Sequence, residues 1–224
     1  AILEPMVQVV IFGAIFLVLD KKPPLGDTAM AFFLTAFIPL MLIRNLTIAL
    51  CAAIRENKQL LYFSVVTNTD VIMARALLEI ITITTVTVLL FSFISLAGYQ
   101  GAPVYPLSTL AAFAVASLLG IGFGFIGAII APVFKSWSRI VQWLNRGFFF
   151  TSGIFFYPAM LPSQAQDVIK YNPVAHIIDW CRVSFYYGYN SDFYSVWTMF
   201  YLGLGFLLLG LSLERLMRRK ISAL

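Results

Sequence analysis

Charged residues are scarce in this chain, because Asp, Glu, Lys and Arg together make up 11% of its 224 residues. In soluble domains such residues make up about a quarter of the chain. Hydrophobic residues make up 61% of this sequence, and 16% of it is aromatic. This composition excludes a water-soluble globular protein and indicates that a lipid bilayer surrounds much of the surface.

Motifs for nucleotide and metal chemistry are also absent. The sequence contains no GxxxxGK[ST] phosphate loop, so it cannot hydrolyse ATP by that mechanism. Its two cysteines, Cys51 and Cys181, lie in an apolar run and in a distant loop, which makes a disulfide framework improbable. No metal-ligand spacing accompanies the single histidine. We therefore expect no catalytic residue, no metal site and no cofactor on this chain.

The net charge of +5 does not predict a nucleic-acid partner. Such a partner requires a basic face on a soluble module, whereas the basic residues here separate apolar runs. Eleven of the fifteen Lys and Arg residues would lie on the cytoplasmic side if the N-terminus is inside: Arg44, Arg55, Lys58, Arg75, Lys135, Arg139, Arg146, Arg215, Arg218, Arg219 and Lys220. Because cytoplasmic flanks are enriched in Lys and Arg, we predict an N-in, C-in orientation.

Six apolar runs approach or exceed the length of a membrane-spanning helix, which is roughly 20 residues. They cover residues 2–19, 30–54, 71–96, 107–131, 140–157 and 193–213. We therefore predict an all-α integral membrane protein with six transmembrane helices, forming a single transmembrane domain over residues 1–224. The sequence begins with Ala1 directly before an apolar run, so we expect a native N-terminal segment to precede it.

Small residues recur at every fourth position of the run 107–131, at Ala112, Ala116, Gly120, Gly124 and Ala128. Such spacing places them on one helical face, where another helix can approach closely in lipid. We favour this packing role over a nucleotide-binding turn, which the GIGFG segment superficially resembles.

Two connections are longer than the others. Residues 54–70 are amphipathic and predict a short helix across the inner face, whereas residues 161–192 contain two helical patterns separated at Asn172-Pro173 on the outer side. Both fit interfacial helices that seat a protein among lipid headgroups.

One helical face of the outer connection carries His176, Asp179 and Arg182. A membrane enzyme acting on polyprenyl phosphate could use His as nucleophile or base and Arg to hold phosphate. We favour a polar face of an amphipathic outer helix, because no second basic cluster accompanies these residues.

Two arginines are placed at or near membrane depth, where ionisable groups indicate function by default. Arg44 could pair with Glu79 on the next helix or face a polar cavity. Arg146 could extend to the membrane interface or contact an anionic ligand. Aromatic residues follow it and cluster towards the outer side, where flat rings could stack on sugars as a polymer slides past: Phe148, Phe149, Phe150, Phe155, Phe156, Tyr157, Tyr186, Tyr187 and Tyr189.

Several segments together are similar to a known family. LEPMVQVVIFGAIF (3–16), ENKQLL (56–61), ARALLE (74–79) and SGIFFYPAMLP…YNPVAHIIDWCR…YGY (152–189) resemble the permease subunit of type-2 ABC exporters. The resemblance is closest to capsular-polysaccharide export permeases of the KpsM type, and it covers essentially the whole chain. That family also has an amphipathic N-terminal helix before the first span.

The resemblance implies a homodimer in a bacterial inner membrane, paired with two ATPase subunits that bind ATP and Mg. Its implied cargo is a lipid-linked, acidic capsular polysaccharide, and periplasmic and outer-membrane export components are expected. O-antigen, teichoic-acid-type and drug exporters are alternatives that share the architecture.

The resemblance also assigns roles to segments. A coupling helix over 54–62 would contact the ATPase through Arg55, Glu56, Asn57, Lys58, Leu60 and Leu61. A re-entrant outer hairpin over 162–188 would gate the pathway with Asn172, Pro173, His176, Asp179 and Arg182.

Overall fold

The computed structural model describes residues 23–221 apart from Asp27, Ser64, Gln100 and Lys135, together with five positions nearer the N-terminus. The side chains of residues 219–221 lie outside this description. The predicted span over residues 2–19 falls largely outside the described residues. Every regular element within the described part is helical, which confirms the predicted all-α class.

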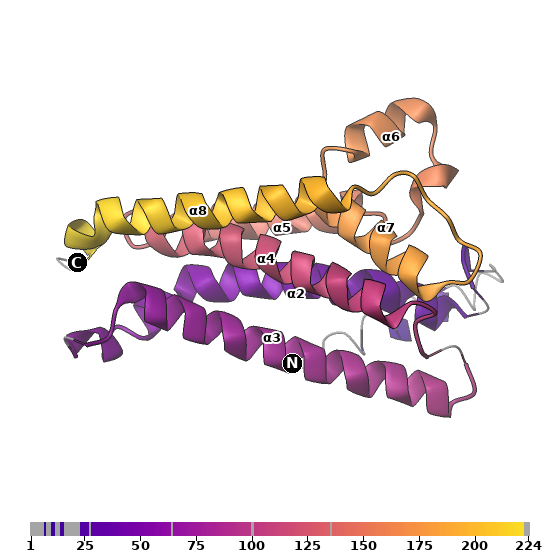
Figure 1. Ribbon diagram of the computed structural model, residues 1–224, viewed down its shortest axis with the longest axis horizontal. Helices are drawn as coiled ribbons and strands as arrows, with labels where there is room; N and C mark the ends of the chain where they lie inside the picture. The colour runs from indigo at the N-terminus through magenta and orange to yellow at the C-terminus, as the bar shows by residue number, and fades with distance from the viewer. Residues whose placement is uncertain are drawn as a thin grey trace. The chain divides into compact units, whose positions relative to one another are not determined.

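The elements follow one another in the order drawn in Figure 1. They are α2 (Ala29–Glu56), η1 (Leu60–Tyr62), α3 (Asn68–Leu96), α4 (Pro106–Ile130), α5 (Trp137–Thr151), η2 (Pro158–Met160), α6 (Ser163–Ile169), α7 (Pro173–Phe185) and α8 (Val196–Ile221).

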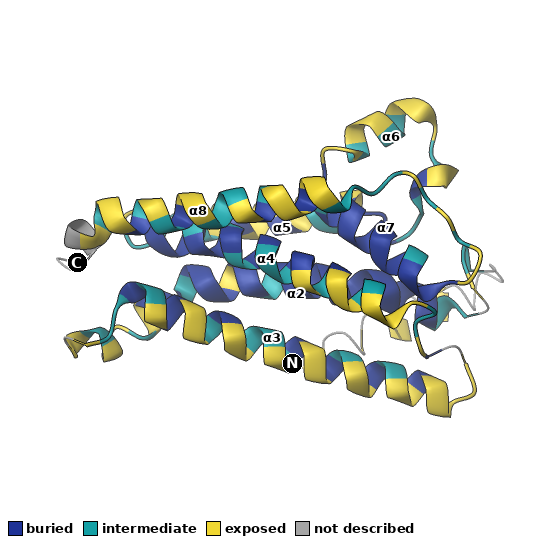
Figure 2. Ribbon diagram, viewed as in Figure 1, coloured by how far each residue is buried: buried dark blue, intermediate teal, exposed yellow. Residues whose placement is uncertain are grey.

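Four of these helices are long and apolar enough to cross a membrane: α2, α3, α4 and α8 over Val196–Arg218. The first three begin and end within three residues of the predicted spans, whereas α8 extends well past residue 213. Figure 2 shows an exposed face along much of α3, whereas α7 is almost wholly buried. The exposed side chains of α3 are mostly apolar, as a surface that contacts lipid or another apolar partner requires.

The predicted helix over 140–157 is wrong at its C-terminal end. The observed helix, α5, has 15 residues and ends at Thr151, so it is shorter than the four candidate spans. Gly153 then adopts a φ of +78°, which a right-handed helix does not accommodate. Pro158 begins a separate 3-10 turn, because it has no N–H for helical bonding.

The predicted single helix over 54–62 is also wrong. Helix α2 continues to Glu56, and the Asn57 side chain donates to the carbonyl of Ala53 at 2.9 Å. A turn over residues 57–59 separates α2 from the 3-10 helix η1. By contrast, the two predicted outer helices are confirmed as α6 and α7, with Asn172 at the N-cap of α7 and Pro173 in its first turn.

The chain forms two compact units. The first, named the α7 unit here, comprises Ala1–Met41, Thr82–Ala114 and Phe148–Val196. The second, the α8 unit, comprises Leu42–Ile81, Val115–Gly147 and Trp197–Leu224.

Helix α7 is held inside the α7 unit by contacts with α3 and α4. The rings of Phe185 and Phe91 lie 5.1 Å apart. The indole N–H of Trp180 donates to the hydroxyl of Ser108 at 2.9 Å. Burial on several sides explains why α7, with only 13 residues, is a stable helix.

In the α8 unit, the small residues of α4 allow close helix contacts, as predicted. A Cβ added at Gly120 would lie 3.0 Å from the Cβ of Leu46 on α2, and one at Gly124 would lie 3.0 Å from the Cβ of Leu50. Gly122, which is outside the predicted ladder, faces Gly203 on α8. Helix α4 therefore uses small residues against two neighbouring helices.

Candidate functional site

Arg182 is fully buried on α7, and its guanidinium binds the backbone that follows α5. Its Nη1 atom donates to the carbonyls of Gly153 and Phe156, each at 2.7 Å, and Nη2 donates to that of Ile154 at 3.1 Å. The guanidinium carbon also lies 4.1 Å from the centre of the Phe32 ring. Arg182 therefore fastens segment 153–156 to α7.

The acceptors are available because α5 ends just before them. Carbonyls beyond a helix end have no helical partner and need another donor. The left-handed conformation of Gly153 turns the chain there, and a Cβ at this position would lie only 3.2 Å from the Phe156 carbonyl oxygen. Gly153 thus shapes the turn whose carbonyls Arg182 binds, although the two residues lie far apart in the sequence.

Asn172 forms a second connection between α5 and α7. Its Oδ1 atom accepts from the N–H of Val174 at 2.9 Å, which caps α7. Its Nδ2 atom donates to the hydroxyls of Thr151 at 2.9 Å and Ser152 at 3.3 Å. The predicted gate residues Asn172 and Pro173 therefore lie at a fixed joint.

Both ring nitrogens of His176 are occupied by backbone groups. The Nδ1 atom accepts from the N–H of Ser195 at 3.2 Å, so it is unprotonated. Nε2 then carries the proton and donates to the carbonyl of Lys170 at 2.9 Å. The ring also stacks on Phe193, with the centroids 4.8 Å apart. The histidine holds two loops together and presents no nitrogen for acid–base chemistry.

Asp179 connects α7 to the segment that follows it. Its Oδ1 atom accepts from the Tyr189 hydroxyl at 2.7 Å. Burial raises the pKa of the Asp179 carboxyl, while hydroxyls of Ser191 and Tyr189 and the charge of Arg182 oppose the rise. Burial lowers the pKa of Arg182 to about 10, so the guanidinium still carries its charge at neutral pH.

The prediction that His176, Asp179 and Arg182 form a polar face of an amphipathic helix is wrong in one respect. They share α7, but all three are buried and each binds a different segment of the chain. Sequence reasoning missed Gly153, Asn172's hydroxyl partners and the pairing of Tyr189 with Asp179. For Gly153, the only signal in the sequence was its place directly after the Thr151-Ser152 pair at the end of the helix.

The predicted aromatic residues differ in exposure. Phe150 and Tyr187 are exposed, Tyr186 is buried, and Phe148, Phe149, Phe155, Phe156, Tyr157 and Tyr189 are half-buried. Phe149 and Phe155 pack with their rings 6.1 Å apart. Tyr157 meets Tyr189 edge to face at 5.6 Å. Most of these rings therefore pack within the α7 unit and expose only part of their surface.

The two predicted pathway arginines both belong to the α8 unit. Arg44 is half-buried on α2. Arg146 is exposed on α5, with its guanidinium carbon 5.2 Å from the centre of the Trp143 ring. Glu79, considered above as a partner of Arg44, forms a salt bridge with Arg75 at 3.2 Å.

The connection between α2 and α3 exposes both charged and apolar side chains. Arg55, Glu56 and Lys58 are exposed, Leu60 is about half exposed, and Asn57 and Leu61 are half-buried.

Beyond the predicted residues, Tyr62, Phe63 and Val65 are exposed by 80%, 65% and 87%. We name residues 57–65, apart from the undescribed Ser64, the α2–α3 tip. Its apolar residues form a candidate surface for a partner protein.

Comparison with known proteins gives a family match over most of the chain. The family model described as "ABC-2 type transporter" matches residues 1–186.

Individual relatives extend the match. The chain is 26% identical over 215 residues to the polysialic acid transport protein KpsM of Escherichia coli, covering 96% of this chain and 83% of that protein. It is 27% identical to the capsule polysaccharide export inner-membrane protein CtrC of Neisseria meningitidis serogroup A, covering 81% and 69%. It is 29% identical to the corresponding protein BexB of Haemophilus influenzae, covering 72% and 60%.

Proposed function

Because this chain belongs to the ABC-2 type transporter family, we propose that it is the membrane permease subunit of an exporter for capsular polysaccharide in a bacterial inner membrane. The observation that carries the proposal is the similarity to capsule export proteins over most of the chain. The four long apolar helices support a membrane location. The chain provides the route for the polymer and catalyses no reaction itself.

The working assembly contains two copies of this chain and two ATPase subunits that bind ATP and Mg. Each copy crosses the membrane six times, with both termini in the cytoplasm. The apolar exposed surfaces of α3 and α8 support contact with lipid or a second copy. Periplasmic and outer-membrane components then receive the polymer.

The ATPase binds at the C-terminal end of α2 and at the α2–α3 tip. Exposed Arg55, Glu56 and Lys58 supply polar contacts, and Leu60 and Tyr62 supply apolar contacts. A surface that exposes both apolar and charged side chains is suited to a protein interface.

The cargo is a lipid-linked, acidic polysaccharide. Arg44 and Arg146 contact its anionic end, and exposed rings such as Phe150 and Tyr187 guide the sugars.

The hairpin over residues 162–188 gates the outer end of the pathway. The bond from His176 Nε2 to the Lys170 carbonyl at the end of α6 supports movement of α6 and α7 as one body.

The alternative of a polyprenyl-phosphate enzyme is disfavoured by His176, because both of its ring nitrogens are bound to backbone. O-antigen, teichoic-acid-type and drug exporters share the same architecture, so the transported substrate distinguishes them.

The test is ATP-driven export by the chain together with its partner ATPase. We expect the two proteins to be isolated as one complex and inverted membrane vesicles to take up acidic capsular polymer only with hydrolysable ATP. Uptake of O-antigen or of a drug instead would overturn the cargo assignment. Phosphatase activity of the chain alone, abolished by His176→Ala, would overturn the permease assignment.

An Arg146→Ala variant tests the pathway. We expect it to reduce polymer uptake while the complex assembles normally. Arg139→Ala, which removes another basic residue of the same helix, is the matched control. If Arg146→Ala takes up as much polymer as Arg139→Ala, Arg146 does not contribute to the pathway.

A further inference from the structure

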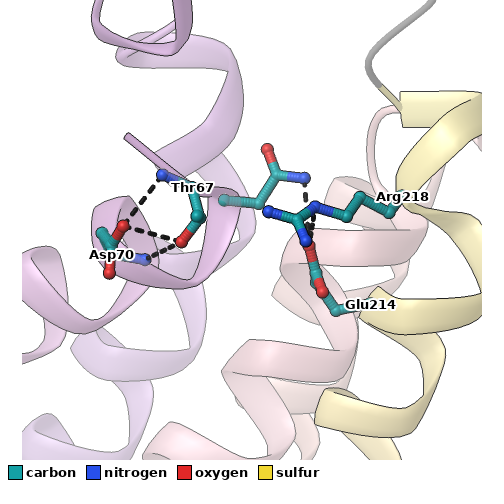
Figure 3. Close-up of polar contacts among 5 residues, drawn as sticks. Thr67, Asp70, Glu214 and Arg218 are labelled. Atoms are coloured by element: carbon teal, nitrogen blue, oxygen red, sulfur yellow. Dashed lines mark hydrogen bonds and ion pairs between the residues drawn. The ribbon is translucent and has the colours of Figure 1, made fainter. Parts of the chain in front are cut away.

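A buried carboxylate connects α8 to α3 within the α8 unit, as Figure 3 shows. Glu214 lies near the C-terminal end of α8 and is only 6% exposed. Its Oε1 atom accepts from the Nδ2 atom of Asn68 at 3.3 Å and lies 3.8 Å from the Nε atom of Arg218. These two contacts differ, because Asn68 is buried whereas the Arg218 side chain is 57% exposed.

Asn68 is the first residue of α3 and directly follows the connection that carries the α2–α3 tip. A reciprocal cap holds this turn. The N–H and hydroxyl of Thr67 donate to Asp70 Oδ2 at 2.8 and 2.7 Å, and the N–H of Asp70 donates to the Thr67 hydroxyl at 3.3 Å. A cap of this type fixes the entry of the chain into a helix. Asn68 therefore moves together with the end of the connection.

The buried bond is the one that a displacement of the connection would change. A buried carboxylate without a donor loses the stabilisation that replaces its hydration. Arg218 makes only a long and largely solvated contact, whose contribution is small. Asn68 is therefore the main polar partner of the Glu214 carboxylate.

We propose that Glu214 and Asn68 form a positioning link that transmits displacement of the α2–α3 tip to α8. This inference rests on the proposed function, because the displacement would come from the partner ATPase. Glu214 touches neither nucleotide nor polymer. Its role is to keep α8 and the first turn of α3 moving together, so that ATP hydrolysis produces transport.

The test exchanges the two polar groups in the complete complex with its ATPase, reconstituted in liposomes. Asn68→Asp places a second carboxylate against Glu214 and should lower the polymer exported per ATP hydrolysed by about tenfold, a typical size for coupling between sites. Glu214→Gln retains an acceptor for Asn68 and should remain close to the wild type. The double variant restores an amide facing a carboxylate and should recover most of the export per ATP.

Arg218→Gln is the control for the exposed contact, and it should leave export per ATP nearly unchanged. A merely structural role would lower the amount of complex without changing export per ATP in the complex that remains. The link would be overturned if Asn68→Asp exported as much polymer per ATP as the wild type. It would also be overturned if the double variant did not recover export per ATP. If Asn68→Asp does not assemble, Asn68→Ala removes the donor without adding charge, and unchanged export per ATP would overturn the link equally.

These outcomes are separate from failure of the proposed function. If the wild-type complex moves no polymer, the permease assignment fails. If the wild type transports and the Asn68 variants transport equally well per ATP, only the link fails.

Discussion

At the scale of single residues, Arg182 binds three carbonyl groups of the segment 153–156. A guanidinium suits this arrangement because its donors point outwards in a fixed plane. An ammonium group has three donors around one atom and cannot reach acceptors spread in this way. Burying a charge is costly unless hydrogen bonds replace its hydration, and the carbonyls supply that replacement here.

Replacing Arg182 should destabilise the protein, by an amount that depends on the residue that replaces it. Arg182→Met leaves three carbonyls without their donor and should cost about 3 kcal/mol of unfolding free energy. Arg182→Lys retains the charge but reaches fewer carbonyls, so its loss should be intermediate. Thermal unfolding of the purified protein in detergent measures both changes. Lys170→Met, which removes an exposed cation from a surface pair, is the control and should change little. Wild-type stability of the Lys variant would show that the planar donors are not needed.

At the scale of elements, α4 packs closely against α2, and the contact at Gly127 leaves no room for a larger side chain. Gly127 is one position before Ala128 of the small-residue ladder, and it faces Cys51 on α2. An added methyl group at Gly127 would collide with the Cys51 sulfur, while the Cys51 Cβ would remain 3.7 Å away, at ordinary contact distance. The Trp137 Nε1 atom would lie 3.2 Å away, so the Cys51 sulfur is the main obstruction and the indole a lesser one.

Gly127→Ala should accordingly destabilise the protein by about 1–3 kcal/mol, the usual cost of overpacking. Combining it with Cys51→Ala should recover most of that loss, because the second change removes the colliding atom. Unfolding midpoints of the two single variants and the double variant measure the coupling. If the two effects simply add, the collision is not the cause.

The long helices were predictable from the sequence, and the short ones were less so. The ends of α2, α3 and α4 follow from sustained apolar runs, which require no knowledge of tertiary contacts. The end of α5 depends on Gly153 and on Arg182, a donor far along the chain. The periodicity of α7 predicted that His176, Asp179 and Arg182 share a helix. It could not predict burial, because that depends on which segments pack around the helix.

At the scale of the whole molecule, the proposed orientation places the α2–α3 tip and the outer hairpin on opposite sides of the membrane. Two exposed tyrosines report on these segments: Tyr62, which is 80% exposed, and Tyr171, which is 89% exposed. Both native cysteines are free and buried, so they contribute little background in a thiol-labelling experiment.

A membrane-impermeant maleimide should therefore label Tyr171→Cys in intact spheroplasts. It should label Tyr62→Cys only after the membrane is permeabilised, because the reagent cannot reach the cytoplasm otherwise. The unmodified protein is the background control in each condition. Labelling of both positions from the same side would contradict the six-span, N-in topology.

The contacts of Arg182 also have a consequence for biosynthesis. Its three acceptor carbonyls lie 26–29 residues earlier in the chain, so the ribosome makes them before it makes the arginine. Phe32, which faces the guanidinium, is made earlier still. Proteins are synthesised from the N-terminus. Every residue that contacts this guanidinium is therefore already in the chain when the arginine is added.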